Sequence, residues 1–529
     1  MNSVEFVDLA TCGENVFSGQ CEVCVVGAGA AGIYLAVELA SRGLDVVLLE
    51  AGNTSGTDVS DIGFDARFDA ELYPGATAGR FFGLGGSTSR WGGLLIPHTR
   101  NDLRENTAVG FDIWRHIVET VADKTVPVLD KLGWHNGDDF SAFARHQLNE
   151  SGAALHVAGF DVAAGLFLPF SKKNLVCLLK RKLTSGSRLR VIYNAVVNGW
   201  QAEPEIDDAR IRQVQAVSRN GNRLVITAQR FIVTAGAIES ARILLELNHS
   251  SPQPLVRESS AIGCYLADHL SLPIADVAAG SIENAIKLFA PRFAKSWMRS
   301  FRFLESNPPK DAPRAFSHFI FDNQNPGFAL AKEALGALQG RRLPKLLAMD
   351  IASGIGGLVR LCYHRYANAR LYIPPNTQTH LQLDIEQVPV RENGIKLGDE
   401  LDRYGRRIAK IHWRIGDGDA ENIRLTAKRF LEKWPGETSS LPTLLPRLDN
   451  CDAKKPHDAY HPVGTCRMGS DAEAVVDGNL KVWGLENLWV VSTGVLPSAG
   501  TANPTFTMLC LAERLAEQLA ASKSHPWLT

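Results

Sequence analysis

A glycine-rich turn between a short apolar run and a helical pattern constrains this chain more than any other feature. Residues 22–27 read Glu-Val-Cys-Val-Val-Gly, a β-branched run typical of a buried strand, and residues 30–42 follow with helical spacing until Gly43. A second apolar run over residues 44–49 ends at Glu50. The pattern predicts one βαβ unit of about 30 residues with two parallel strands.

Three glycines occupy the turn of this unit. Gly27, Gly29 and Gly32 form G-x-G-x-x-G directly after the strand, and Glu50 follows Gly32 by 18 residues. The first glycine permits the tight turn, the second admits a pyrophosphate to the backbone, and the third lets helix and strand pack closely. Glu50 would accept hydrogen bonds from an adenosine ribose and would repel a 2′-phosphate. We therefore predict a dinucleotide site that disfavours NADP, with a purely structural turn as the alternative.

Length and composition set the broad class of the protein. At 529 residues the chain exceeds the roughly 100–200 residues of one domain, so at least two domains are expected. Hydrophobic residues make up 45% and charged residues 21%, which excludes wholesale disorder, and the net charge of -1 argues against nucleic acid as a partner. No histidine or cysteine spacing indicates a metal site.

The same survey gives expectations about compartment. Nine scattered cysteines without paired spacing favour a reducing environment. The first twenty residues lack the basic and apolar regions of a signal peptide, so we expect a cytoplasmic protein. No apolar run reaches the roughly 18 residues of a transmembrane segment.

Two further loops carry glycines that would let a flat ligand approach the backbone. One spans residues 82–93 and the other residues 234–242, where a predicted strand runs through Ala235 and Gly236 into a helix. Together with the first turn they predict a long dinucleotide. Residues 461–469 (His-Pro-Val-Gly-Thr-Cys-Arg-Met-Gly) and 500–505 (Gly-Thr-Ala-Asn-Pro-Thr) form two more loops, each held by Gly and Pro.

These motifs resemble, in the same order, those of the glucose-methanol-choline (GMC) family of flavin oxidoreductases. The resemblance covers residues 21–100, about 187–270, about 380–415 and 457–519. It implies an α/β fold: a Rossmann-type FAD-binding domain with a parallel sheet and an antiparallel β-meander, and a second α+β substrate domain on an antiparallel sheet. The expected FAD domain is discontinuous, over 1–110, 185–280 and 450–529, and the substrate domain takes 111–184 and 281–449.

The resemblance also implies that FAD binds in an extended form. Its pyrophosphate would lie on the three glycines, its ribose at Glu50, and its adenine at the backbone of Val197. The implied cofactor-binding residues are Gly27, Gly29, Gly32, Glu50, Gly85, Gly86, Ser87, Arg90, Trp91, Val197, Ala235, Gly236, Asp477, Thr501 and Pro504. Arg90 stands where members with a covalent flavin carry histidine, so a non-covalent FAD is expected.

Two residues are the candidates for catalysis. His461 matches the family's active-site histidine, and an imidazole with a pKa of about 6.5 can take the hydroxyl proton of an alcohol. Asn503 matches a family position held by His or Asn, and its amide can hydrogen-bond the developing alkoxide. Hydride would pass to flavin N5 and leave a carbonyl. The alternative is a hydroxynitrile-lyase type of cleavage with a redox-silent flavin.

The substrate and the electron acceptor are less constrained. Trp91-Gly92 and the segment 386–389 resemble the pyranose oxidase and sugar dehydrogenase branch, which favours a carbohydrate-like secondary alcohol and makes Gln387 a candidate substrate-binding residue. The sequence contains no second strand-bound G-x-G-x-x-G that could hold a nicotinamide cofactor. The electron acceptor is therefore expected to be oxygen, a quinone or a protein carrier. We interpret the basic stretches 291–302 and 340–370 as solvated helix faces, with docking to a membrane surface or an electron-accepting protein as the alternative.

Overall fold

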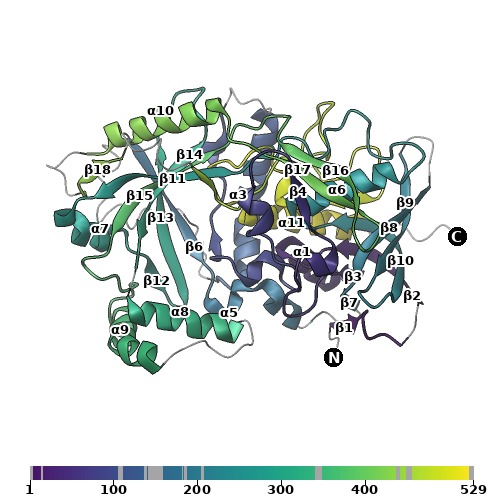
Figure 1. Ribbon diagram of the computed structural model, residues 1–529, viewed down its shortest axis with the longest axis horizontal. Helices are drawn as coiled ribbons and strands as arrows, with labels where there is room; N and C mark the ends of the chain where they lie inside the picture. Colours follow the sequence, from purple (N-terminus) through teal and green to yellow (C-terminus); the bar gives the residue numbers. More distant parts are fainter. Residues whose placement is uncertain are drawn as a thin grey trace.

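A computed structural model describes residues 4–13, 16–104, 111–135, 140, 159–181, 183, 188–203, 208–323, 325–339, 348–435, 441–447 and 456–522. Two bodies lie side by side, one around a mostly parallel sheet and one around an antiparallel sheet (Figure 1). The predicted fold class, a Rossmann-type α/β fold with a second antiparallel sheet, is confirmed.

The predicted βαβ unit is present. It consists of β2 (Val16–Val26), α1 (Ala30–Ser41) and β3 (Asp45–Leu49), and the two strands pair in parallel. The Gly27 N–H donates to the Leu49 carbonyl at 2.8 Å, so the turn begins where the two strands end. Almost every residue of α1 is buried, so the helix is enclosed on most sides and is not an amphipathic surface helix.

The two strands of this unit belong to an eight-stranded sheet. Its order is β1 (Glu5–Asp8), β7 (Arg188–Tyr193), β3, β2, β10 (Arg223–Val233), β9 (Arg210–Val217) and β8 (Val196–Glu203), and β20 (Leu488–Val490) also pairs with β10. The strands from β1 to β10 are parallel, and β10, β9 and β8 form the antiparallel meander. Asn194, at φ 55°, divides the apolar run 189–197 into β7 in the parallel sheet and β8 in the meander.

The second body is a nine-stranded sheet. Its main path is β18 (Leu444–Pro446), β11 (His269–Val277), β15 (Thr379–Glu386), β14 (Ala315–Phe321), β13 (Trp297–Glu305), β6 (Phe160–Phe167) and β5 (Leu94–Leu95), joined by β12 (Arg292–Ala294) and β19 (His457–Asp458). The basic stretch 291–302 therefore forms strands, not the helix face we expected. Residues 340–347 of the other basic stretch lie outside the described residues.

A small third sheet follows β15 in the chain. It consists of β16 (Gly394–Leu401) and β17 (Arg407–His412), which pair with each other in antiparallel orientation, and of β4 (Ala66–Phe68), which pairs with β17 in parallel. This three-stranded sheet lies between the two larger bodies (Figure 1).

Helices cover both bodies. The first carries α6 (Gly236–His249) and α11 (Pro504–Ala521) beside α1, with α3 (Phe111–Leu132), α2 (Pro74–Thr77) and α5 (Phe170–Lys173) nearby. The second carries α7 (Ile282–Phe289), α8 (Pro326–Gln339), α9 (Ala348–Ala367) and α10 (Asp417–Lys433). Among the described residues, no helix combines the length and apolar character needed to span a bilayer.

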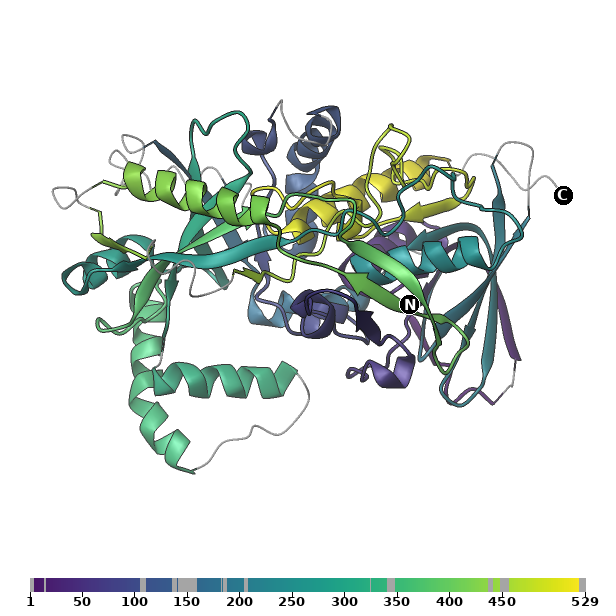
Figure 2. The ribbon, with the colours of Figure 1, turned by 45° about the horizontal axis from the view of Figure 1, so that its top comes forward.

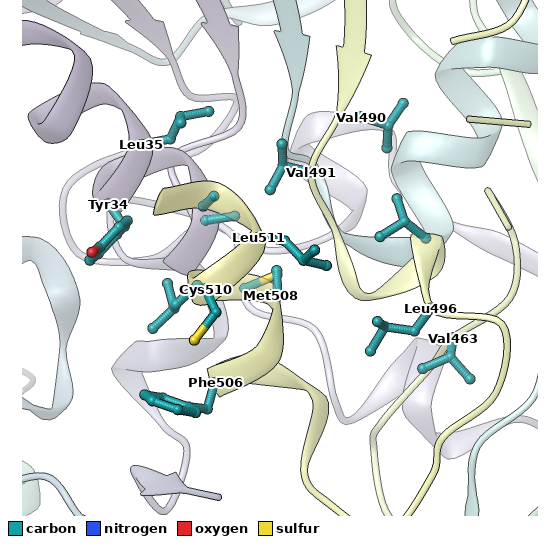
Figure 3. Packing of buried hydrophobic residues seen from close by; sticks show 14 of the residues in the cluster. Tyr34, Leu35, Val463, Val490, Val491, Leu496, Phe506, Met508, Cys510 and Leu511 are labelled. Atoms are coloured by element: carbon teal, nitrogen blue, oxygen red, sulfur yellow. The ribbon is translucent and has the colours of Figure 1, made fainter. Parts of the chain in front are cut away.

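The core behind the first sheet positions α11. Leu511 of α11 lies next to Val491, while Phe506 lies farther from the strand ends, near the start of the helix (Figure 3). Glu513 of α11 is buried and accepts a hydrogen bond from the Tyr34 hydroxyl at 2.9 Å. The same carboxylate pairs with Arg42 at 2.6 Å and Lys131 at 2.5 Å, so it joins α11 to α1 and α3. The middle of α11 is thereby fixed beside α1 and α3.

Candidate functional site

Three helices begin at the wall of one cavity. The wall includes Gly29 and Ala30 at the start of α1, Ala235 and Gly236 at the start of α6, and Pro504 at the start of α11. None of the three N-cap residues caps its helix with a side-chain hydrogen bond. The free N–H groups and the positive ends of three helix dipoles therefore face the same space, which favours a bound anion.

The glycines of the first turn have separable roles. A Cβ on Gly32 would lie 1.8 Å from the Gly27 carbonyl oxygen and 2.6 Å from the Thr234 hydroxyl, so only glycine allows α1 to pack here. A Cβ on Gly29 would meet nothing within 4 Å. Gly29 is therefore not required by the fold itself, and its missing side chain leaves room at the cavity wall. A Cβ on Gly86 would lie 3.0 Å from the Gly29 Cα, so the second glycine loop touches the first.

Glu50 directly follows the last residue of β3. One carboxylate oxygen accepts from the Ala28 N–H at 2.8 Å, and the other accepts from Gly52 at 2.9 Å and Gly83 at 3.0 Å. Burial raises the pKa of this carboxyl, while these three N–H donors oppose the rise. Glu50 thus ties the two glycine-rich loops together and also belongs to the cavity wall.

Most predicted cofactor-binding residues lie on the wall of this cavity. On the wall are Gly27, Gly29, Glu50, Gly86, Ser87, Trp91, Val197, Ala235, Gly236, His461 and Pro504. Off the wall are Gly32, Gly85, Arg90, Gln387, Asp477, Thr501 and Asn503. Of this second group, Asn503 still reaches the site through its side chain, as described below.

Several predicted site residues that do not line the cavity make hydrogen bonds elsewhere. Gln387 is fully buried: its Nε2 donates to the Arg414 carbonyl at 2.8 Å and its Oε1 accepts from the Trp413 indole at 2.9 Å. Both ends of its amide are therefore used, and the structure does not bring Gln387 to the cavity as a substrate-binding residue. Asp477 accepts from two backbone N–H groups of its own turn, those of Asn479 and Lys481, rather than facing the cavity.

Thr501 and Arg90 have similarly local roles. The Thr501 N–H and hydroxyl both donate to Asp102, at 2.7 and 2.9 Å, which fixes the loop before α11. Arg90 is exposed and its guanidinium lies 4.3 Å from the Phe81 ring centroid. These contacts shape the loops around the cavity without placing either side chain on its wall.

The two predicted catalytic residues lie together. The His461 Nε2 is 2.9 Å from the Asn503 Nδ2, although the residues are 42 positions apart in sequence. Asn503 occupies the N-cap of α11, a position where asparagine normally caps the helix, but its side chain reaches His461 instead. On the other side of the ring, His461 Nδ1 lies 3.1 Å from Nδ1 of His269, the first residue of β11.

This chain of contacts fixes the tautomer of His461. His269 Nε2 lies 2.9 Å from the Gly500 carbonyl oxygen, which can only accept, so His269 must donate there. Burial lowers the pKa of His269 to about 4, so its ring is neutral and its Nδ1 accepts. His461 must then donate from Nδ1 and keep a lone pair on Nε2. That nitrogen, the one facing Asn503, is the basic atom of the site.

Arg302 of β13 sets the orientation of the Asn503 amide. Its Nη2 donates to the Asn503 Oδ1, which turns the Asn503 Nδ2 toward His461. Arg302 is buried, lies 3.7 Å over the Phe316 ring centroid, and pairs with no carboxylate within 4.0 Å in the part of the chain that the structure describes. Burial lowers the pKa of its guanidinium, yet an arginine keeps its proton at neutral pH. A buried positive charge therefore lies next to the predicted catalytic pair, and the Asp384 carboxylate is the charge that opposes it.

A buried carboxylate holds both histidines in place. Asp268 accepts from the His461 backbone N–H through both oxygens at 2.9 Å, and from the His269 backbone N–H at 2.7 Å. The Tyr73 hydroxyl donates to the same carboxylate at 2.5 Å. One acidic side chain thus fixes the two segments that carry the imidazoles.

Sequence reasoning missed His269, Arg302 and Asp268. Each comes from a strand, or the start of a strand, in the second sheet, far along the chain from residue 461. The adjacent pair Asp268-His269 at a strand start was the one local signal available. A single sequence offers no way to tell that β11 and β13 meet the 461 loop.

Replacing Asp268 with asparagine should destabilise the protein. The asparagine amide has only one oxygen that can accept, and its NH2 group would face the backbone N–H groups of His269 and His461. Because at least one of these buried N–H groups loses its partner, the expected cost is about 1–3 kcal/mol. We expect a corresponding fall in the free energy of unfolding, measured by denaturant titration. Asp399→Asn, at a fully exposed carboxylate, should leave that free energy unchanged. An equal value for both variants would show that the Asp268 clamp contributes nothing.

A second cavity lies between β13, β14 and α8. Seven phenylalanines belong to its wall, namely Phe167, Phe289, Phe301, Phe303, Phe319, Phe321 and Phe328. Arg302 is also a wall residue, and its guanidinium hydrogen-bonds Asn503. The residue thus belongs both to this apolar cavity and to the hydrogen-bond network of the predicted catalytic pair.

The residues of the first cavity fit FAD. Three uncapped helix starts suit a diphosphate, and the Gly29–Gly86 contact leaves bare backbone where a flat ring or a phosphate can approach. The wall includes Val197 and Glu50, the predicted adenosine contacts, as well as His461. A cofactor with an adenosine end and a reactive end matches this arrangement.

Comparison with protein families supports the same reading. Residues 389–512, which include His461 and Asn503, match the family model for GMC oxidoreductase, and residues 25–78 match that for an NAD(P)-binding Rossmann-like domain. An oxygen-dependent choline dehydrogenase of Proteus mirabilis is 36% identical over 111 residues, which is 20% of this chain and 20% of that protein. A 2-methyl-1,2-propanediol dehydrogenase of Mycolicibacterium austroafricanum is 24% identical over 310 residues, 57% of this chain and 50% of that protein. The matches thus span half or less of these relatives' lengths.

Solved structures with the same fold cover nearly the whole chain. Pyridoxine 4-oxidase from Mesorbium loti superposes with a TM-score of 0.55 and 18% identity, over 96% of this chain and 100% of that one. A formate oxidase from Aspergillus oryzae RIB40 gives a TM-score of 0.55 and 17% identity, over 96% and 99%. The likeness at these identities concerns the fold. The match to the GMC oxidoreductase family model concerns residues 389–512.

Proposed function

We propose that this protein is an FAD-dependent oxidoreductase that converts the CH–OH group of an alcohol to a carbonyl. One observation carries the proposal: a neutral imidazole nitrogen of His461 and the amide of Asn503 lie 2.9 Å apart at the wall of a cavity suited to a dinucleotide. The similarity to a choline dehydrogenase and a diol dehydrogenase supports the same reaction class.

The protein groups are complementary to an alcohol hydroxyl. His461 Nε2 accepts the hydroxyl proton, and Asn503 Nδ2 donates to the oxygen as its negative charge develops. The Arg302 cation, which orients Asn503, stabilises the same charge through space. When bound, FAD supplies the hydride acceptor. A non-covalent link is proposed because Arg90 stands in the glycine-rich loop where a covalent link would require histidine.

An anaerobic substrate screen tests the proposal directly. Bleaching of the yellow flavin by an alcohol, with the matching carbonyl product identified by NMR, is the expected result. A flavin that stays yellow with every alcohol, while cyanide is released from cyanohydrins, would replace oxidation by lyase chemistry. Mixing the reduced protein with oxygen, a quinone or a protein carrier then identifies the electron acceptor.

The substrate is proposed to carry a sugar-like secondary hydroxyl together with an apolar group. The first part rests on Trp91-Gly92, which resembles the sugar-oxidising branch, and Trp91 lies on the cavity wall. The second rests on the phenylalanine-lined cavity that Arg302 joins to the catalytic pair. A glycoside with an apolar substituent satisfies both. Faster flavin bleaching by aryl glycosides than by free sugars and by simple alcohols is the expected ranking.

Arg302 gives the proposal a pH signature. Burial, then His269, then Arg302 lower the pKa of His461 well below its ordinary value of 6.5. The active base is the neutral form, so the rate of flavin reduction should hold as pH falls through 6.5 and drop only in more acidic solution. Arg302→Gln removes one positive charge, which raises the His461 pKa and moves the acid limb to higher pH. Stopped-flow reduction across pH measures the shift.

The matched control for this variant is Arg424→Gln, at an exposed arginine of α10. It makes the same charge change far from the site and should leave the acid limb in place. An unmoved limb in Arg302→Gln would show that the guanidinium does not act on His461.

A further inference from the structure

Helix α9 exposes apolar side chains where a surface helix normally exposes polar ones. Ile355 is 54% exposed, Val359 63% and Tyr366 83%. Positions 355, 359, 362 and 366 are three or four apart, so they share one face of the helix. The exposed apolar stripe of α9 comprises Ile355, Leu358, Val359, Cys362, Tyr363 and Tyr366.

The other side of α9 is taken by α8. A Cβ on Gly327 would lie 2.3 Å from the backbone of Gly357, and one on Gly354 would lie 2.9 Å from Leu330. The two helices thus cross with their backbones in contact and form a pair that projects from the rest of the molecule (Figure 2). Because α8 occupies the inner side of this pair, the apolar stripe faces outward from a projecting element.

Basic residues accompany the stripe. Arg360 and Arg365 lie on α9, and residues 354–367 contain no acidic residue. Residues 340–367 hold five Lys and Arg residues and one Asp, a formal charge of +4 in a chain of net charge -1. Apolar and tyrosine side chains beside arginines are the composition of helices that lie in the interface of an anionic bilayer.

We propose that α9 docks on the surface of an anionic lipid bilayer, with its apolar stripe in the headgroup region and the exposed Arg360 against lipid phosphates. Charge complementarity and shape favour a bilayer over a protein partner, since a projecting convex helix suits a deformable surface. The helix lies in the interface and does not span it, which agrees with the finding on membrane-spanning helices above.

Flotation of the flavin-loaded protein with lipid vesicles tests the proposal. Vesicles of phosphatidylcholine with phosphatidylglycerol should carry the protein upward, pure phosphatidylcholine vesicles should carry much less, and added salt should weaken the binding. Val359→Glu should lower the bound fraction about tenfold, because it places a charge in the apolar stripe. Arg360→Glu should lower binding to anionic vesicles selectively.

Two matched controls separate docking from general surface effects. Leu401→Glu alters an apolar residue of β16 that is 60% exposed, close to the 63% of Val359. Arg424→Glu makes the same charge reversal as Arg360→Glu on α10. Both controls should bind vesicles like the unaltered protein, and the flavin content of all four variants should match it.

Three results would overturn the proposal. The first is no binding to anionic vesicles. The second is binding that Val359→Glu leaves unchanged. The third is light scattering that shows a dimer which Val359→Glu converts to a monomer, because the stripe would then cover a second copy of the chain.

Discussion

Replacing His461 with alanine is expected to leave FAD bound and to slow its reduction by alcohol by a factor of about 10²–10⁴. The reason lies in the tautomer chain that runs from the Gly500 carbonyl through His269 to His461 and leaves a lone pair on Nε2. Alanine removes that nitrogen, so the hydroxyl proton has no acceptor as the hydride departs. Anaerobic stopped-flow absorbance at the flavin band measures the rate.

A nearby histidine, His457, provides the control for this variant. His457 is exposed and lies four residues before His461, in the short strand β19. His457→Ala should retain both flavin and rate. If His461→Ala reduced its flavin as fast as His457→Ala does, the base would have to be another group.

The second large effect is expected from two glycines three residues apart. Gly32→Ala forces a methyl group to within 1.8 Å of the Gly27 carbonyl oxygen, so α1 must move off the strand, at a cost of about 3 kcal/mol or more. Gly29→Ala meets no atom within 4 Å, and the φ of Gly29 is -77°, which alanine adopts readily. We expect the first variant to lose stability and the second to keep it while losing affinity for FAD.

Two measurements on each variant separate these outcomes. Denaturant unfolding of the flavin-free protein should report a large loss for Gly32→Ala and a change of about 1 kcal/mol or less for Gly29→Ala. Titration with FAD, followed by flavin fluorescence, should show weakened binding for Gly29→Ala. Unchanged FAD affinity in Gly29→Ala would mean that the diphosphate does not approach this turn.

Local patterns predicted the parts of the fold that are built from neighbouring residues. The βαβ unit was predicted correctly because its strand, turn and helix signals are continuous over residues 22–52. The helix α11 is equally local, since residues 505–520 form one amphipathic segment and the helix covers Pro504–Ala521. Both His461 and Asn503 lie on loops whose composition marked them, and the structure brings these two residues together.

A single sequence does not show where one strand changes its neighbours. In β10, Arg223–Thr227 pair with β9 while Phe231–Val233 pair with β20, all along one continuous strand that β2 flanks on its other side. The partners of Gln387 were equally hidden, because the Trp413 and Arg414 groups that bind its amide come from another segment of the chain.

The order in which the site is assembled has a consequence for biosynthesis. The cavity needs β2 and α1 from the first fifty residues, and it also needs α11, which ends at Ala521 and is tied to α1 through Glu513. A ribosome must therefore synthesise the chain past Ala521 before this cavity can close. Until then the nascent first sheet lacks one of its covering helices, so the apolar face that α11 covers stays exposed to water.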